Sequence, residues 1–216
     1  DNDRVEEIHI KEKNLQSKKI KDLVELADHK KINIKVVNDN KNWKFKSTEY
    51  IAAICNPKKI FKDSDLGRFS KTNFIVCDHI QDTNNLGAIA RSAASFDFNV
   101  MCIPERRSAR LNERTFKISS GGLETIEILE YKSIFTLIKK FQSMDIWTIG
   151  LDMNGDQSIQ NFDVGNQFLA FFIGSEENGL SNEIQNKLDE VLNISTTNKI
   201  ESLNVSVAAG IAMQHI

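Results

Sequence analysis

The sequence lacks long hydrophobic runs, paired cysteines and clustered histidines, and each absence excludes a class of protein. No run of eighteen or more apolar residues occurs, so we expect a soluble protein without a membrane-spanning helix. Its three cysteines are widely separated, which argues against a disulfide framework or a thiolate metal site and fits a reducing cytoplasm. Its four histidines are scattered, so no metal site is predicted.

Two common nucleotide-binding loops are also missing. No Gly-x-Gly-x-x-Gly follows the first strand of the main α/β pattern, and no Gly-x-x-x-x-Gly-Lys-Ser/Thr occurs, so dinucleotide and P-loop folds lose their main support. The chain begins Asp-Asn-Asp-Arg, without Met or an apolar stretch, which does not resemble a signal peptide. We therefore expect further sequence to precede it.

The length of 216 residues and the 40% hydrophobic content allow one large domain and one small one. Residues 1–66 hold 15 basic and 12 acidic side chains (+3), and the remainder holds 13 and 18 (−5), which together give the net charge of −2. This asymmetry favours a basic recognition module beside a catalytic domain. That these lysines only solvate a small domain is an equally open interpretation.

The first part of the chain predicts a small α/β unit. A strand is expected over 7–10, a helix over 18–29 and further strands over 32–37 and 50–55. The charged stretch after Asn56-Pro57 is typical of an edge and linker. We therefore place one domain at 1–66 and a second at 70–216.

The second part alternates between strand and helix patterns. The expected strands cover 74–77, 99–103, 125–129, 146–151, 168–173 and 191–194, and the expected helices cover 86–96, 134–144, 182–188 and 205 onward. This alternation predicts a mainly parallel sheet with helices on both faces. Because such sheets bind ligands at the carboxyl ends of their strands, the loops after Cys77, Ile173 and Ile194 are the candidate site.

The first motif occupies residues 82–92. Asp82 or Thr83 can cap a helix, and Asn85 offers a hydrogen-bond donor and an acceptor at its start. Gly87 lies one turn before Arg91, which predicts free space for a ligand beside a guanidinium suited to phosphate. A capped surface helix with a solvated arginine is the alternative.

Two further motifs follow buried strands. In residues 171–180 an apolar strand ends at Gly174, which permits a close backbone approach, and a polar turn follows. In residues 194–211 a loop carries Ser202 and Asn204 into a helix whose small residues, Ala208, Ala209 and Gly210, allow close packing against a neighbour.

Three segments taken together resemble the three motifs of the SpoU family in the SPOUT superfamily. They read Asn-x-Gly-Ala-Ile-x-Arg-Ser-Ala, Gly-Ser-Glu-x-x-Gly-Leu and Ser-Leu-Asn-Val-Ser-Val-Ala-Ala-Gly-Ile. The resemblance covers residues 74–216. It implies an S-adenosylmethionine-dependent ribose 2′-O-methyltransferase acting on structured RNA, with a C-terminal trefoil knot and a homodimer that completes the active site. Residues 1–66 more weakly resemble part of the substrate-binding domain of bacterial 23S rRNA guanosine 2′-O-methyltransferases.

The resemblance also implies roles for particular residues. The positions of the family's cofactor-binding residues are Gly174, Ile194 and Leu203. The positions of its catalytic motifs are Asn85, Arg91, Glu176, Ser202 and Asn204. Departures occur where Ser195, Thr196 and Asn198 replace the usual Pro, Met and Gly, where Glu177 replaces Gly, and where Thr48-Glu49-Tyr50-Ile51 replaces a His-Gln-Gly signature.

Several alternatives stay open at this point. A tRNA ribose methyltransferase would use the same motifs, and the altered loop at Ser195–Asn198 suits a non-catalytic relative that binds RNA or assembling ribosomes. RNA contact should be directed mainly at phosphates. The candidate contacts are Lys18, Lys19, Lys21, Arg106, Arg107 and Arg110, although these charges could instead only solvate the surface. A guanidinium stays protonated in proteins, so we expect Arg91 to hold phosphate and stabilise a developing alkoxide.

Overall fold

The computed structural model divides the chain into two compact units, residues 1–58 and 59–216. It describes residues 4–38, 42–45, 49–197, 199 and 202–216. The division falls earlier than the boundary near residue 70 that the sequence predicts. The reason is that the segment expected to be an edge and linker adds a strand, β4 (Ile60–Lys62), and a 3-10 helix, η2 (Asp63–Phe69), to the larger unit.

The smaller unit is a three-stranded sheet with the order β2-β1-β3. Its elements are β1 (Val5–Lys11), the 3-10 turn η1 (Glu12–Asn14), α1 (Lys18–His29), β2 (Asn33–Val37) and β3 (Ile51–Cys55). The helix begins at Lys18 because the Ser17 side chain accepts a hydrogen bond from the backbone of Ile20. Since α1 is the crossover between β1 and β2, these two strands pair in parallel. The predicted helix is confirmed at both ends.

The larger unit contains an eight-stranded sheet with the order β4-β7-β6-β5-β10-β8-β11-β9, in which every pair is parallel. Its strands after β4 are β5 (Phe74–Cys77), β6 (Val100–Pro104), β7 (Glu127–Tyr131), β8 (Trp147–Leu151), β9 (Gln157–Ser158), β10 (Leu169–Ile173) and β11 (Glu190–Asn193). The predicted parallel sheet is confirmed.

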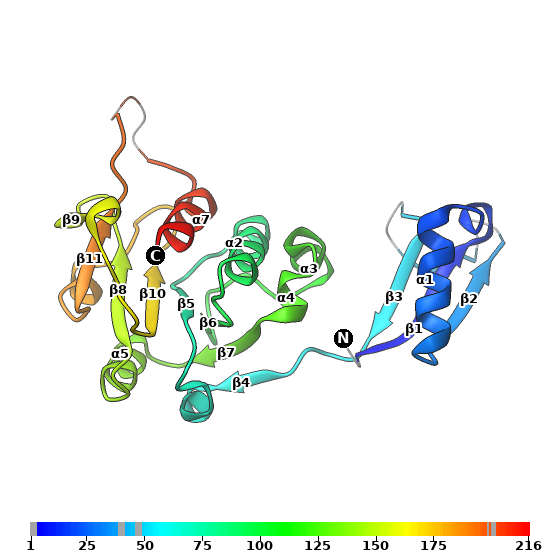
Figure 1. Cartoon of the computed structure of the whole chain (residues 1–216), viewed down its shortest axis with the longest axis horizontal. Helices are drawn as coiled ribbons and strands as arrows, with labels where there is room; N and C mark the ends of the chain where they lie inside the picture. Colours follow the sequence, from blue (N-terminus) through cyan, green and yellow to red (C-terminus); the bar gives the residue numbers. More distant parts are fainter. Residues whose placement is uncertain (1–3, 39–41, 46–48, 198, 200–201) are drawn as a thin grey trace. The chain divides into compact units, whose positions relative to one another are not determined.

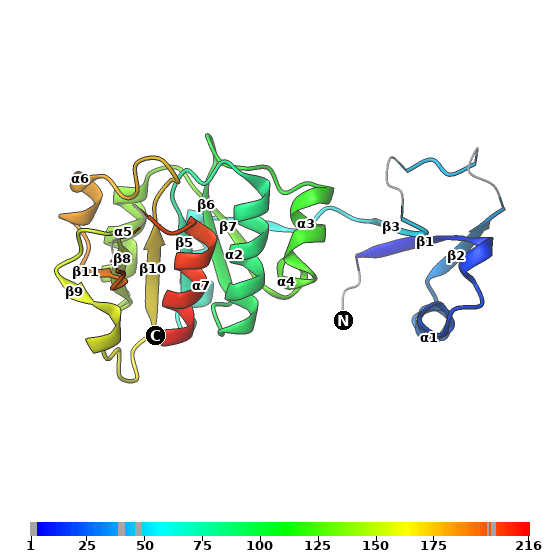
Figure 2. The ribbon, with the colours of Figure 1, turned by 90° about the horizontal axis from the view of Figure 1, so that it is seen from above.

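Helices cover both faces of this sheet. They are α2 (Thr83–Ser95), α3 (Glu113–Ser119), α4 (Gly122–Thr125), α5 (Ile134–Gln142), the 3-10 helix η3 (Ile159–Asn161), α6 (Asn182–Gln185) and α7 (Val205–His215). In Figure 1, α2, α3, α4 and α7 lie on one face of the sheet and α5 lies on the other. Figure 2 shows α7 beside α2 above the central strands.

The alternation of side chains along each central strand produces two hydrophobic cores. Ile75 of β5 and Phe171 of β10 point into the core under α2 and α7, whereas Phe74 and Phe172 point into the core under α5. Strands that are buried on both faces appear in sequence as continuous apolar runs. This explains why β5 and β10 contain no polar residue.

Two sequence expectations differ from the structure in the middle of the larger unit. The polar segment 105–120, for which no helix is predicted from the sequence, contains α3, whose N-cap Asn112 accepts a hydrogen bond from the backbone of Thr115. A strand expected at 125–129 is β7, two residues later, because α4 continues to Thr125. None of the described helices is both long and apolar enough to cross a membrane.

Candidate active site

The three sequence motifs meet at the carboxyl edge of the sheet. Strand β10 lies between β5 and β8, β11 follows β8, and all four are parallel. The loops that leave these strands therefore emerge on the same side of the sheet. The first two motifs begin in the loops after β5 and β10, and the third begins after β11.

The start of α2 positions the first motif. Asp82 is the N-cap, and its Oδ1 accepts a hydrogen bond of 2.7 Å from the backbone of Asn84. This confirms the predicted cap and places Asn85 in the first helical turn, where its side chain is 9% exposed. Arg114 of α3 donates two hydrogen bonds to the Asn84 side chain, of 3.1 and 2.9 Å, which fixes the helix start against α3.

Asn85 connects residues from all three motifs. Its Nδ2 donates to Oε1 of Glu176 at 2.9 Å, and its Oδ1 accepts from Nδ2 of Asn204 at 3.0 Å. Asn204 is also the N-cap of α7, because its Oδ1 accepts from the backbone of Ser206. Side chains separated by 91 and 119 positions in sequence thus form one hydrogen-bonded cluster.

Two other residues expected at this site are exposed. Arg91 is exposed on α2, six positions after Asn85 and so on a different side of the helix. Ser202 is exposed in the loop before α7. The prediction of ligand space beside Gly87 is wrong, since a Cβ there would lie 2.9 Å from Ile118 of α3. Packing between helices, and not a ligand, requires that glycine.

The three expected cofactor-binding residues lie on the loops after β10 and β11. Gly174 is buried, and a Cβ on it would lie 1.9 Å from the backbone of Gly179, so the loop's own fold demands glycine. Ile194 is half-buried against the core, and Leu203 is also half-buried. In the altered loop, the Ser195 hydroxyl lies 3.0 Å from that of Ser158 beside β9. Asn198 lies outside the described residues.

A cavity of about 810 Å³ opens beside the cluster. Asn85 and Glu176 line it, together with Asp78 and His79 from the loop after β5. Sequence reasoning missed the last two, although their position directly after a buried strand was the available signal. Asp78 is 8% exposed and accepts hydrogen bonds from the Tyr131 hydroxyl at 2.9 Å and from the His79 ring at 2.8 Å.

Burial dominates the electrostatics behind this cavity. It raises the pKa of Tyr131 well above its ordinary value, and the adjacent Asp78 carboxylate raises it further. The pKa of the Cys77 thiol is raised by burial first and then by the charges of Asp78 and Glu176. Cys77 and Tyr131 therefore stay protonated, and the tyrosine acts as a hydrogen-bond donor. Within the described residues, no group of three or more His, Cys, Asp or Glu side chains could hold a metal ion.

The expected RNA contacts are all exposed. Lys18, Lys19 and Lys21 form the start of α1, where they follow the Ser17 cap. Arg106, Arg107 and Arg110 lie in the loop after β6. Of these three arginines, Arg107 also lines the 810 Å³ cavity. Backbone hydrogen bonding from Ala109 to Ile80 holds the arginine loop against the loop that follows β5.

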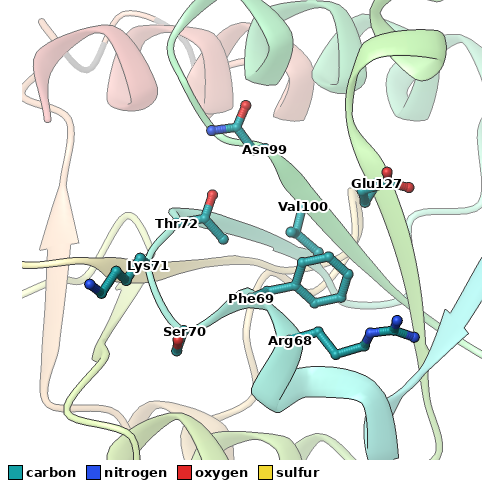
Figure 3. A pocket seen from close by; sticks show the side chains of 8 residues that line it. All are labelled: Arg68, Phe69, Ser70, Lys71, Thr72, Asn99, Val100 and Glu127. Carbon is teal, nitrogen blue, oxygen red and sulfur yellow. The ribbon is translucent and has the colours of Figure 1, made fainter.

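A second pocket, of about 340 Å³, lies at the opposite edge of the sheet. Figure 3 shows its lining, which comes from residues 68–72 before β5, from Asn99 and Val100 at the start of β6 and from Glu127 at the start of β7. These residues mark the amino ends of the strands. Parallel sheets place their ligand sites at the carboxyl ends, so the larger cavity is the candidate active site.

The fold matches solved methyltransferase structures over almost the whole chain. The SpoU methyltransferase AviRb from Streptomyces viridochromogenes, in complex with AdoMet, is similar with a TM-score of 0.79 and 19% identity, covering 98% of this chain and 81% of that one. A protein of the TrmH family from Porphyromonas gingivalis gives a TM-score of 0.72 at 18% identity, covering 98% of this chain and 82% of that one. At these identities the likeness shows the fold, which is that of the SpoU/SPOUT methyltransferases.

Sequence comparison specifies the family. Residues 72–214 match the SpoU rRNA Methylase family, and the chain belongs to it. An uncharacterized tRNA/rRNA methyltransferase of Mycobacterium leprae is 36% identical over 142 residues, covering 66% of this chain and 46% of that protein. A similarly named protein of Mycobacterium avium is 35% identical over the same coverage. The chain thus spans about half the length of these relatives.

Proposed function

We propose that this protein transfers a methyl group from S-adenosylmethionine to a ribose 2′-hydroxyl of structured RNA, with a guanosine of 23S rRNA as the target. The observation that carries the proposal is the hydrogen-bonded cluster in which Asn85 joins Glu176 and Asn204. A single sequence motif could serve packing alone. Three motifs whose polar side chains converge beside a cavity favour chemistry at that place.

The residues at the carboxyl edge fit S-adenosylmethionine. Strands β10 and β11, which flank β8, lead into loops that contain Gly174, Ile194 and Leu203, and these residues would hold the cofactor largely through their backbone. Half-buried apolar side chains at positions 194 and 203 suit an adenine ring. The bound cofactor would supply an already activated methyl group, so the protein's main task is to align the ribose hydroxyl with it. The predicted trefoil knot near the C-terminus belongs to this proposal.

The position of Arg91 supports a homodimer. Its guanidinium is exposed on α2, apart from the Asn85 cluster of its own chain. Helix α7 packs against α2, with Gly210 facing Ser92, and exposes Val207 and Ile211 to the extent of 50% and 42%. Exposed apolar side chains on a helix beside a functional arginine are expected at an interface between subunits. A second copy would cover this surface and bring Arg91 to a site where it holds RNA phosphate and stabilises the developing alkoxide.

RNA contacts in the proposal come from both units. Lys18, Lys19 and Lys21 would contact phosphates from the smaller unit, which we propose as part of a substrate-binding domain. Arg106, Arg107 and Arg110 would do so close to the cavity. Ser202, exposed two positions before Asn204, would contact RNA or the cofactor in the assembled site.

Two experiments test the proposal. The first is a calorimetric titration with S-adenosylmethionine and with its demethylated product, and the second is a methylation assay on 23S rRNA fragments and on tRNA. We expect saturable binding of both ligands and methyl transfer to rRNA. Asn85→Ala should lower the transfer rate by about 100-fold or more while cofactor affinity changes little, because the cluster orients reacting groups. Asn186→Ala, an exposed asparagine after α6, is the matched control.

Each failure in these assays has a separate meaning. A dimeric, folded protein that binds neither cofactor form would be a non-catalytic RNA-binding relative, and the altered loop at Ser195 would then be its cause. A preference for tRNA would replace the rRNA target while leaving the chemistry in place. Mapping the modified nucleotide distinguishes a ribose product from a base product.

A further inference from the structure

His79 has a backbone conformation that histidine rarely adopts. Its φ is 58°, in the left-handed region, directly after strand β5. A side chain with a Cβ loses stability in that region compared with glycine, and such residues persist mainly where the surrounding structure holds them for a function. The loop could accommodate glycine at this position, yet it presents an imidazole to the cavity.

Asp78 fixes the orientation of that imidazole. Its Oδ1 lies 2.8 Å from Nδ1 of His79 and accepts a second hydrogen bond from the buried Tyr131 hydroxyl. Because the carboxylate can only accept, Nδ1 of His79 carries the hydrogen, and Nε2 of the neutral ring keeps its lone pair. The His79 side chain is 43% exposed, so this second nitrogen remains accessible.

The cavity suits a sugar better than a phosphate. Besides Asp78, its acidic lining residues are Asp82, Glu176, Glu177 and Glu183, whereas Arg107 and His79 are the basic ones. This excess of negative charge repels phosphate groups and offers acceptors to hydroxyl donors. Phe135, at the start of α5, adds an apolar wall against which a base can pack.

We propose that His79 is a further catalytic residue, whose Nε2 accepts the proton of the target 2′-hydroxyl in the cavity it shares with Asn85 and Glu176. This inference rests on the proposed function. As the ribose O–H bond breaks, a new bond forms between that oxygen and the methyl carbon. The bond from that carbon to sulfur breaks, and its electron pair stays on sulfur, which becomes a neutral thioether. Asp78 stabilises the resulting imidazolium.

The inference predicts a distinct pH dependence. A base works only when it is unprotonated, so methyl transfer that uses His79 as the base should be slower at acidic pH than at neutral pH. The charged groups that face His79 are Asp78, Asp82, Arg107, Glu176, Glu177 and Glu183.

The role of His79 is tested by measuring the single-turnover methylation rate of the His79→Gly variant between pH 5 and 9. Glycine tolerates the left-handed backbone, so this variant should fold. We expect a methylation rate at least about 100-fold below that of the natural protein, and this rate should no longer fall at acidic pH, a decline we call the acidic limb. Added imidazole should restore part of the rate, and the affinity for S-adenosylmethionine should stay within about two-fold of that of the natural protein. His29→Gln, which alters an exposed histidine in the last turn of α1, is the control and should match the natural protein.

The results separate this inference from the function on which it rests. If the natural protein methylates RNA and His79→Gly does so equally fast with the same pH profile, the role of His79 is overturned and the methyltransferase stands. A slow variant that imidazole does not rescue, with the acidic limb retained, also overturns it in favour of a purely structural role. If the natural protein methylates no RNA, both fall. Nitrogen-15 NMR at pH 8 adds a readout without RNA, since a proton on Nε2 of His79 would contradict the proposal.

Discussion

The two units of the chain differ in how their sheets are covered. In the smaller unit α1 packs on one face, over a core of Ile8, Ile10, Ile20 and Ala27. In the larger unit helices lie on both faces, and two cores enclose the central strands (Figure 1). The buried apolar area, and with it the hydrophobic contribution to stability, is therefore much greater in the larger unit.

This difference determines where a demanding site can be built. The candidate active site lies on loops whose ends are held by strands buried on both faces, so that Asn85, Glu176 and Asn204 meet within hydrogen-bonding distance. On the second sheet face of the smaller unit Glu7 pairs with His9 and Lys35, and the buried His9 ring lies 5.0 Å from the ring of Phe45. A sheet that is buried on both faces is a rigid scaffold, and such a scaffold suits a catalytic site.

The largest expected effect comes from truncating each core. Phe171→Ala should destabilise the larger unit by about 3–5 kcal/mol, and Ile20→Ala the smaller one by about 2–4 kcal/mol, because each leaves a cavity. The two tryptophans, Trp43 and Trp147, lie in different units, so variants with a single tryptophan report each unfolding transition by fluorescence in denaturant. Ile20→Ala should lower the denaturant midpoint of the transition that Trp43 fluorescence reports (the Trp43 midpoint). It should leave the corresponding midpoint for Trp147 unchanged. A common shift of both would show that the units unfold together.

A smaller effect is expected on the affinity for RNA. The experiment replaces basic side chains in one unit or in the other and compares the two losses of affinity. Replacing Lys18, Lys19 and Lys21 with alanine should weaken affinity and flatten its dependence on salt by about three ions, one for each lost phosphate contact. Replacing Arg106, Arg107 and Arg110 should do the same. Electrophoretic mobility shifts at several salt concentrations measure both. An equal loss on replacing the exposed Lys71, Lys139 and Lys187 would instead indicate unspecific attraction.

The smallest effect is on the pH dependence of stability, which should differ in direction between the units. The pKa of Glu7 is lowered, chiefly by the hydrogen bond from Lys35, so its stabilisation is present above the ordinary range of about 4.3 and is lost as the pH falls. The pKa of Tyr131 is raised by burial, so its contribution is present below about 10 and is lost as the pH rises. Acid should therefore lower the Trp43 midpoint, and alkali the Trp147 midpoint. Glu7→Gln and Tyr131→Phe should each flatten the corresponding slope.

Local patterns in the sequence predicted most elements of the fold. The apolar runs at β5 and β10 and the cap at Asp82 depend on neighbours within a few residues, which a sequence displays directly. Elements held by distant partners were missed. Strand β4 has three residues and exists through pairing with β7, and β9 has two and pairs with β11. Neither has a periodicity long enough to detect.

For the candidate site, the sequence by itself determined the motif residues, their position after buried strands, and through them the family. It predicted Asn85, Glu176 and Asn204 as members of one site, but not that Asn85 bridges the other two. It also gave no indication that Arg91 lies apart from them, or that α3 fills the space beside Gly87. The hydrogen bond from Tyr131 to Asp78 was decided by tertiary structure alone, because a bond between residues 53 positions apart depends on the order of strands in the sheet. Strand order results from packing across the whole unit, which no local pattern encodes.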